Sequence, residues 1–226
     1  MPWKNIAGAL TRIDSGSVTN VWGVNSNDDI FRYTGDDSNP WVHIPGKLKD
    51  IGAASDGTVW GVNANSDIYR YNWTTNHWTQ INGKLVRISA GSRTNVWGVN
   101  SANDIYRYTG DDSNPWVQIP GKLVDIGAGA DGTVWGVNAA GNIYRYTGDQ
   151  GSTHWVQIPG ALSAISVGDR TNVWGVNSGA NIYTFTADDA KAWVQIAGAL
   201  VDIGAGADGT VWGVNGGGNI YRWSRG

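Results

Sequence analysis

The sequence predicts an all-β protein, a closed β-propeller of six blades with four antiparallel strands each. Three observations predict this fold. The string Val-Trp-Gly-Val-Asn occurs six times, at intervals of about 38 residues. Each interval contains four short runs rich in β-branched and aromatic residues, separated by turn-forming residues. A second tryptophan recurs in the same rhythm, at Trp3, Trp41, Trp78, Trp116, Trp155 and Trp193. We therefore expect residues 1–226 to form a single domain of six repeats.

The fourth repeat shows the four expected strands most clearly. We place them at residues 123–128, 133–138, 142–146 and 155–158, with turns Gly-Ala-Asp-Gly and Ala-Ala-Gly and a polar stretch between them. Four antiparallel strands in a unit of this length are typical of a propeller blade. Apolar residues at helical spacing are not found, so helical repeats are excluded.

The two ends of the chain predict how the ring closes. Residues 3–6 have the pattern of a fourth, outer strand, whereas the chain stops just after a third strand that ends at Trp223. We expect residues 3–6 to complete the last blade beside residues 200–223. Hydrogen bonds between the two would remove the open strand edges of an incomplete ring.

The six copies differ in two regular ways. The turn before the central tryptophan contains Asn20, Asn95 or Asn172 in the odd repeats and Asp-Gly-Thr in the even ones, so the copies alternate as three pairs. Equivalent positions of the innermost strand hold Arg12, Asp50, Arg87, Asp125, Ala164 and Asp202. We expect these to line the central channel as a structural ring of alternating charges, with one gap at Ala164.

The middle hairpin of the fourth repeat predicts which side chains face one another. If its turn pairs the residues that flank it, Trp135 lies opposite Arg145 and Gly136 opposite Tyr144. A four-residue turn before this hairpin then places Ile126 on the tryptophan face of the blade. Since opposite faces of adjacent blades meet in a propeller, we expect each large tryptophan to fill the space left by a glycine.

This set of side chains suits a sugar. An aromatic ring offers an apolar surface to a pyranose, while Asn, Arg and Tyr reach its hydroxyl groups, and a tryptophan beside an arginine forms a natural cation–π pair. Two plainer roles remain open for the tryptophans. The central ones would pack between blades, and the outer ones would cover the blade edge.

Composition excludes several other functions. Net charge is −3 and the basic residues are scattered, so we expect no nucleic-acid partner. The absence of cysteine excludes disulfides and thiolate metal sites and fits a reducing compartment. No signal peptide or membrane-spanning stretch is found. We expect a cytoplasmic protein without membrane insertion.

Catalysis is not expected either. The histidines His43, His77 and His154 fall at unrelated positions of the repeat, and there is no nucleophile elbow or phosphate loop. Paired aspartates such as Asp36-Asp37 offer too few oxygens for calcium. We therefore predict no catalytic residue, no metal site and no cofactor.

The repeat resembles a known family. The segments Trp-Gly-Val-Asn and Ile-Tyr-Arg-Tyr, as in residues 135–138 and 143–146, together with Trp-Val-Gln-Ile-Pro-Gly at 116–121, resemble tectonin repeats over the whole chain. They are similar in particular to the fungal tectonin lectins, which are six-bladed and cytoplasmic. The resemblance implies a multivalent carbohydrate-binding lectin for glycans, including O-methylated sugars, on bacterial or nematode surfaces in innate defence.

Carried over by position, the resemblance implies that each repeat binds its ligand with the central tryptophan, the asparagine that follows it and the arginine of the third strand. These residues are Trp22, Trp60, Trp97, Trp135, Trp174, Trp212, Asn25, Asn63, Asn100, Asn138, Asn177, Asn215, Arg32, Arg70, Arg107, Arg145 and Arg222. The fifth repeat has Thr184 in place of arginine, so its site is expected to be weak or absent.

The main alternative is a protein-interaction propeller that does not bind sugar. Such scaffolds usually carry different side chains on each blade, whereas these blades are nearly alike, which favours a repeated small ligand. One sugar site of millimolar affinity contributes only about −4 kcal/mol. Several sites on one rigid ring raise avidity by about 10² to 10⁴ against a dense glycan surface, and a homo-oligomer would extend this further.

Overall fold

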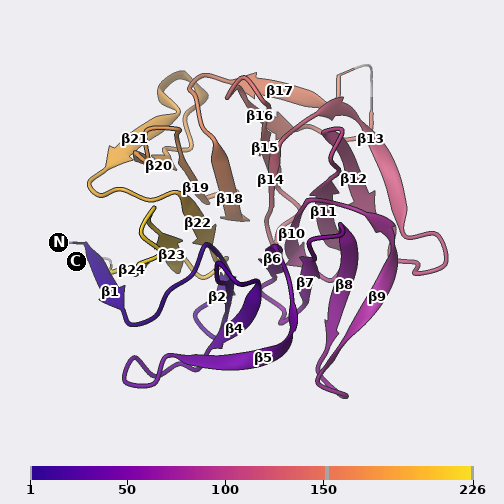
Figure 1. Ribbon diagram of the computed structural model, residues 1–226. Helices are drawn as coiled ribbons and strands as arrows, with labels where there is room; N and C mark the ends of the chain where they lie inside the picture. Colours follow the sequence, from indigo (N-terminus) through magenta and orange to yellow (C-terminus); the bar gives the residue numbers. More distant parts are fainter. Residues whose placement is uncertain (1, 151–152, 225–226) are drawn as a thin grey trace.

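The protein is a ring of six four-stranded antiparallel sheets around a central channel (Figure 1). The computed structural model describes residues 2–150 and 153–224. Blade 1 contains β2 (Arg12–Ser17), β3 (Asn20–Val24), β4 (Asp29–Tyr33) and β5 (Trp41–Lys47). Blade 2 contains β6 (Asp50–Ala53), β7 (Val59–Val62), β8 (Asp67–Asn72) and β9 (His77–Lys84). Blade 3 contains β10 (Arg87–Ser92), β11 (Asn95–Val99), β12 (Asp104–Tyr108) and β13 (Trp116–Lys122).

The second half of the chain forms the other three blades. Blade 4 contains β14 (Asp125–Ala128), β15 (Val134–Val137), β16 (Ile143–Tyr146) and β17 (Trp155–Ile158). Blade 5 contains β18 (Ala164–Asp169), β19 (Asn172–Val176), β20 (Ile182–Phe185) and β21 (Trp193–Ile196), with a short 3-10 turn, η1 (Asp189–Lys191), before β21. Blade 6 contains β22 (Asp202–Ala205), β23 (Val211–Val214), β24 (Ile220–Trp223) and, from the other end of the chain, β1 (Trp3–Ile6).

The predicted closure of the ring is confirmed. Strand β1 pairs antiparallel with β24, in a register that places Trp3 opposite Trp223 and Ile6 opposite Ile220. The N- and C-terminal ends therefore lie side by side at the outer edge of blade 6 (Figure 1). The predicted six-bladed all-β fold is thus the observed one.

The middle hairpin of each blade joins its second and third strands, and its register follows the prediction. The inner hairpin joins the first and second strands, and its register differs from the prediction. Trp135 lies opposite Arg145 and Gly136 opposite Tyr144. Ile126, however, lies opposite Gly136 and not on the tryptophan face. The pair nearest the inner turn is Ala128 with Val134, so five residues separate the paired positions instead of four. A shift of one residue moves every side chain of a strand to the other face.

Leucine, and not tryptophan, fills the space beside each strand glycine. A Cβ atom on Gly136 would lie 2.3 Å from Cδ1 of Leu123, which belongs to the connection between blades 3 and 4. The same leucine–glycine contact recurs in the other five blades. The expectation that the central tryptophans fill this space was wrong, because the leucine that precedes each inner strand already occupies it.

The central tryptophans form the core between adjacent blades. Their exposed fractions range from 0% to 5%. Trp135 of blade 4 packs against the rings of Phe185 and Trp193 of blade 5, with centroid distances of 4.8 Å and 5.9 Å. The outer Trp193 in turn donates its indole N–H to the carbonyl oxygen of Pro159 at 2.9 Å, so it fastens its blade to the connection before it.

The alternation of odd and even repeats decides how the buried indole N–H groups are satisfied. In blade 1, Trp22 Nε1 donates to Oδ1 of Asn20 at 2.7 Å, and Asn20 Nδ2 donates to the carbonyl of Ala54 in blade 2 at 2.7 Å. Blades 3 and 5 repeat both bonds. In the even blades the corresponding indole nitrogens, those of Trp60, Trp135 and Trp212, have no hydrogen-bond partner within the described residues.

Replacing Asn20 with alanine is expected to lower the free energy of unfolding by about 1 to 3 kcal/mol, because the Trp22 N–H and the Ala54 carbonyl both lose a buried partner. Urea denaturation followed by circular dichroism measures this. Thr133→Ala is the matched control, since Thr133 holds the same position before Trp135, whose N–H already lacks a partner. Its expected cost is below about 1 kcal/mol. Equal costs for the two variants would contradict the role given to Asn20.

The channel lining differs from the alternating ring of pairs that the sequence predicts. Arg12 contacts three carboxylates, with Nε 2.8 Å from Asp50, Nη1 2.8 Å from Asp202 and Nη2 3.7 Å from Asp125. Arg87 makes a single, longer contact of 3.8 Å with Asp125. One arginine is therefore the shared counter-ion of three carboxylates in the channel.

A further carboxylate, that of Asp14, lies two residues along the same inner strand. It accepts the main-chain N–H of Ala53 at 2.8 Å, a bond that Ser89 and Ser166 make with their hydroxyl groups in blades 3 and 5. Burial, together with repulsion from Asp202 and Asp50, raises the pKa of Asp14 to about 7, although two main-chain hydrogen bonds oppose the shift. Burial likewise raises the pKa of Asp202 to about 6, against the pull of Arg12.

Candidate functional site

The ligand residues implied by the sequence separate into two groups at opposite ends of the blade. Trp22 and Arg32 face one another across β3 and β4, whereas Asn25 begins the turn at the end of β3. We call the end that carries these asparagine turns the turn face, and the end that carries the outer hairpins, such as residues 34–40, the hairpin face. The tryptophan–arginine pairs and the asparagines therefore cannot bind one small ligand together.

Four arginines form ion pairs with the outer hairpin of the next blade, at the hairpin face. The pairs are Arg70 with Asp112, Arg107 with Asp149, Arg145 with Asp189 and Arg222 with Asp37, each with an N–O distance of 2.8 Å. Arg70, Arg145 and Arg222 use both terminal nitrogens on both carboxylate oxygens, which is the strongest geometry for such a pair. These contacts tie adjacent blades together.

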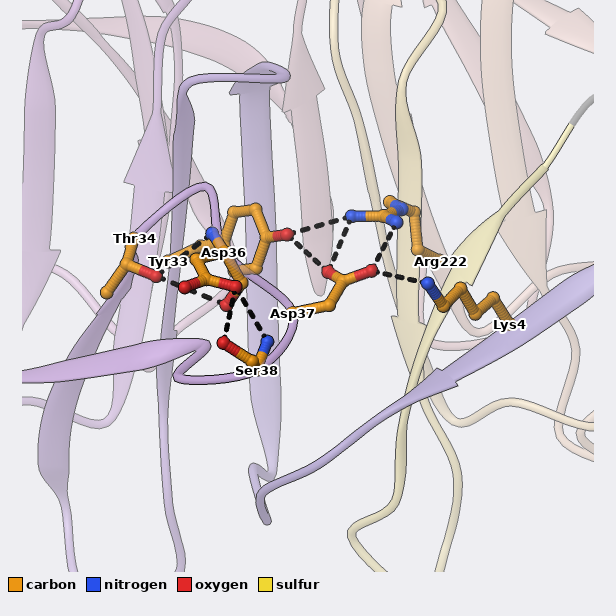
Figure 2. A network of polar contacts seen from close by, with 7 residues as sticks. All are labelled: Lys4, Tyr33, Thr34, Asp36, Asp37, Ser38 and Arg222. Carbon is orange, nitrogen blue, oxygen red and sulfur yellow. Dashed lines mark hydrogen bonds and ion pairs between the residues drawn. The ribbon is translucent and has the colours of Figure 1, made fainter.

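Figure 2 shows the contact that closes the ring between blades 6 and 1. Asp37 receives Lys4 Nζ at 2.6 Å, Arg222 Nη2 at 2.8 Å and the hydroxyl of Tyr33. The hydrogen bonds from Lys4, Tyr33 and Arg222 hold the pKa of Asp37 well below its usual range, although burial opposes the shift. The neighbouring Asp36 accepts from Ser38 instead and stays within its own hairpin.

Beneath each arginine lies the central tryptophan of the same blade. The guanidinium carbons of Arg70, Arg107, Arg145 and Arg222 lie between 5.2 Å and 5.5 Å from the centroids of their tryptophan rings. Since these rings are almost fully buried, a sugar cannot reach their flat faces while the blades stay packed. Their contribution to a hairpin-face site is to hold the arginine in place.

The fifth blade departs from this arrangement, as its sequence indicates. Thr184 lies opposite Trp174, and its hydroxyl donates to the carbonyl of Val173. In blade 6, Trp223 replaces the tyrosine that blades 1 to 4 carry, and its ring lies 5.4 Å from that of Trp174. The junction between blades 5 and 6 thus has an aromatic cluster at the position of the cation–π pair.

At the turn face, the asparagine of each repeat shapes its own turn. Oδ1 of Asn138 accepts the main-chain N–H groups of Ala140 at 3.0 Å and Asn142 at 2.9 Å. The other five asparagines make the same two bonds. The side-chain carbonyl is therefore occupied. In blades 1 to 3 the amide N–H₂ donates to Asp29, Asp67 and Asp104, so the amides of the last three blades are the better placed to reach a ligand.

Two pockets open beside these turns. A pocket of about 310 Å³ between blades 4 and 5 is lined by both turns, including Asn138 and Asn177, and by Ala161. A pocket of about 320 Å³ between blades 5 and 6 is lined by Trp3, Ile182, residues 197–200, Asn215 and Tyr221. Both volumes lie in the range of small-molecule sites, and the second pocket has a mainly apolar wall with a few polar groups.

The pockets occur where the chain lacks a lysine–aspartate pair. In the first three blades, the lysine before the connecting leucine binds an aspartate at the start of the third strand, in the pairs Lys47–Asp29, Lys84–Asp67 and Lys122–Asp104. Lys122 also donates to the carbonyl of Ala102, the counterpart of Ala140 in the pocket lining. The last three blades carry alanine and asparagine instead, as Ala161–Asn142, Ala199–Asn181 and Ala9–Asn219. The side chain that covers the turn is therefore missing there.

Sequence reasoning missed this difference between the halves of the chain, although the signal was present. The lysine and aspartate positions change together, from Lys with Asp in three repeats to Ala with Asn in three.

Within the described ranges 2–150 and 153–224, no three His, Cys, Asp or Glu side chains are grouped so that they could hold a metal ion. No helix in the same ranges is long and apolar enough to cross a membrane.

Comparison with known structures supports the fold. A streptogramin B lyase matches with a TM-score of 0.66 and 20% identity, over 94% of this chain and 78% of that one. A gluconolactonase from Xanthomonas campestris matches with a TM-score of 0.74 and 10% identity, over 97% and 87%. At such identities the likeness shows the fold alone. No curated protein matches the sequence.

The fold and the repeated junctions define a six-bladed propeller built from one repeated blade. The Tectonin domain model matches residues 9–192 and 105–226, and the chain belongs to this family. Tectonin propellers are binding proteins rather than enzymes, although both solved structures named above are enzymes. The resemblance of the repeat motifs to tectonin repeats is thereby confirmed at the level of the family.

Proposed function

We propose that this protein is a multivalent lectin that binds glycans in the turn-face pockets between blades. The observation that carries the proposal is the recurrence of a monosaccharide-sized hollow beside an asparagine amide at junctions where lysine is replaced by alanine. In the pocket between blades 5 and 6, the indole of Trp3 offers an apolar surface, while Asn215 and Tyr221 offer hydrogen bonds.

The same pocket supports a preference for O-methylated sugars. A methyl ether needs a small apolar notch within an otherwise polar site. Ala197, Gly198 and Ala199 line the pocket between blades 5 and 6 without any polar side-chain group. The proposed ligands are methylated sugars on bacterial or nematode surfaces, which the protein meets in innate defence after synthesis in the cytoplasm of a fungal cell.

Valency follows from the arrangement of the blades. Junctions 4/5 and 5/6 hold the two pockets, and junction 6/1, which carries the same alanine and asparagine, is the third proposed site, so the sites are fewer than the six copies of the repeat. Each site is weak by itself, whereas several on one rigid ring raise avidity by about 10² to 10⁴ on a dense surface. The asparagines carry the direct contacts in this proposal. The tryptophan–arginine pairs hold the blades so that the pockets keep their shape.

Transplanting the lysine–aspartate pair into the open junctions is expected to close them. The variant carries Ala161→Lys with Asn142→Asp and Ala199→Lys with Asn181→Asp, which reproduce pairs already present in blades 1 to 3. A glycan array with methylated and unmethylated forms of the same sugars identifies the best ligand. Isothermal titration with that ligand then measures the number of sites per chain, which is expected to fall from three to one.

The reverse exchange is the matched control. Lys84→Ala with Asp67→Asn opens the junction between blades 2 and 3 and is expected to keep or raise the number of sites. Unchanged stoichiometry in the closed variant would remove the turn-face pockets as the sites. Absence of any glycan binding by the unmodified protein would favour a protein-interaction scaffold instead.

A further inference from the structure

Arg32 in blade 1 differs from the other four third-strand arginines. Each of those binds an aspartate from the outer hairpin of the next blade. The outer hairpin that faces Arg32 is Asn72-Trp73-Thr74-Thr75-Asn76-His77, which contains no acidic residue. Within the described part of the chain, Arg32 has no ion pair, and its recorded contacts are with two tryptophan rings.

An exposed indole takes the place of the missing carboxylate. Trp73 is 44% exposed, and the guanidinium carbon of Arg32 lies 5.2 Å from its ring centroid and 6.0 Å from that of the buried Trp22. Trp73 Nε1 donates to the carbonyl of Gly57 at 2.8 Å, so the ring is fixed and not free to swing away. Arg32 thus lies between two indoles and is half-buried.

The polar groups around Arg32 have also changed in a consistent way. In blade 3 the hydroxyl of Tyr108 donates to Asp112, the carboxylate that binds Arg70. In blade 2 the hydroxyl of Tyr71 donates to Oδ1 of Asn76 at 3.3 Å. At the junction between blades 1 and 2, the uncharged amide of Asn76 therefore accepts the tyrosine hydroxyl. At the junction between blades 2 and 3, the carboxylate of Asp112 does so. The arginine is left with an uncompensated charge and unused donors.

Asp56, which precedes the Gly57 that holds Trp73, does not supply the missing charge. Asp56, in the inner hairpin beside Gly57, accepts the main-chain N–H groups of Arg93 at 2.8 Å and Thr58 at 3.0 Å. These bonds hold the pKa of Asp56 below its usual value despite burial, so it is ionised, but it makes no ion pair with Arg32. A carboxylate from outside the chain would complete the arrangement seen at the other four junctions.

We propose that the hairpin-face junction between blades 1 and 2 binds an acidic sugar, a pyranose that carries a carboxylate. The carboxylate takes the position of the missing aspartate and binds the Arg32 guanidinium with two parallel hydrogen bonds. The C–H face of the sugar ring lies on the exposed ring of Trp73, and Asn76 and Tyr71 offer groups to its hydroxyls. This site is distinct from the turn-face pockets and requires no methyl group.

The test uses the full-length protein and D-glucuronate as the probe, titrated by isothermal calorimetry or ligand-observed NMR. D-Glucose, which lacks the carboxylate, and acetate, which lacks the ring, are the comparison ligands. We expect glucuronate to bind with millimolar affinity, at least ten times more tightly than either, and to weaken as salt is raised. Arg32→Gln and Trp73→Ala are each expected to weaken binding of glucuronate at least tenfold.

Two variants separate the site from general effects of charge. Arg70→Gln removes an arginine that already has a carboxylate partner, and it is expected to leave glucuronate binding unchanged. Asn76→Asp places a carboxylate where Asp112 lies at the sister junction, and it is expected to abolish glucuronate binding while leaving the fold intact, as monitored by circular dichroism.

Several results would overturn the proposal. Equal binding of acetate and glucuronate would show a simple anion contact without sugar recognition, and tighter binding of a short poly-glutamate peptide would show a protein-docking site. Unchanged affinity in Arg32→Gln would place the ligand elsewhere. Glucuronate binding is also measured in the variant whose turn-face pockets are closed. Binding that persists there belongs to the hairpin-face site, and binding that is lost there belongs to the turn-face pockets, so the two proposals can fail separately.

Discussion

Replacing Arg12 with alanine is expected to lower the free energy of unfolding by about 3 to 5 kcal/mol at pH 7, because it leaves buried carboxylates without their counter-ion. The side chain is 20% exposed and contacts Asp50, Asp202 and Asp125. Burial alone would lower the pKa of Arg12, but these three carboxylates raise it above its ordinary value. Arg12 is therefore charged at every pH at which the protein folds.

The loss is expected to grow with pH. Burial already raises the pKa of Asp125 and Asp202, and loss of the Arg12 charge raises both further, so the variant loses stability as these two carboxylates ionise. Urea denaturation at pH 5 and pH 8 measures both the size and the slope. Arg87→Ala is the control, because Arg87 is 36% exposed and its one contact is 3.8 Å long. Its expected cost is below about 1 kcal/mol. Equal losses for the two variants would contradict the central role of Arg12.

Replacing Asp14 with serine is expected to stabilise the protein by about 2 to 4 kcal/mol at pH 8, with the gain vanishing near pH 4. The pKa of Asp14 is about 7 in the folded protein, against an ordinary value of 3.8 for an aspartate. Between these values the folded state keeps a proton that the unfolded state has released. The contribution of Asp14 to stability is thus fully present below pH 4 and lost as pH rises through 7.

Serine is the informative substitution because the chain already uses it at the same position. Ser89 and Ser166 accept the main-chain N–H of the next blade with uncharged hydroxyl groups, at 3.0 Å and 2.9 Å. The measurement is the difference in unfolding free energy between variant and unmodified protein from pH 4 to pH 8. Asp14→Asn, which is uncharged throughout, should show the same trend. Parallel pH profiles for Asp14→Ser and the unmodified protein would contradict a protonated Asp14.

Much of the fold follows from the sequence because its signals are local and repeated. The spacing of the Val-Trp-Gly-Val-Asn string gives the number of blades, and the composition of residues 3–6 gives the closing strand. The register of each inner hairpin depends on how many residues lie between the two strand residues that pair nearest its turn. Backbone geometry sets this number, and the composition of the turn does not determine it. The predicted face of Ile126 is therefore wrong.

The candidate site was less accessible to sequence reasoning. The repeated sequence pattern predicts that Trp135 and Arg145 face each other. It cannot show that Trp135 is buried, because a tryptophan used for core packing and one used for ligand binding would both recur in every repeat. The partner of each arginine comes from the next blade, a contact between residues about 42 apart that depends on how the blades sit together. The change from Lys122 to Ala161 was visible in the sequence, yet its meaning required the geometry of the turn.

The pairing of β1 with β24 also imposes an order on assembly. During synthesis β1 leaves the ribosome first, but its hydrogen-bonding partner is the last strand to be made. Five blades are formed from contiguous sequence and can acquire their strands as they emerge, whereas the ring stays open until blade 6 receives both of its ends. Because Arg12 pairs with Asp202, and Asp37 with Arg222, where blade 6 meets blade 1, these charged contacts of the channel and of the hairpin face are completed in that final step.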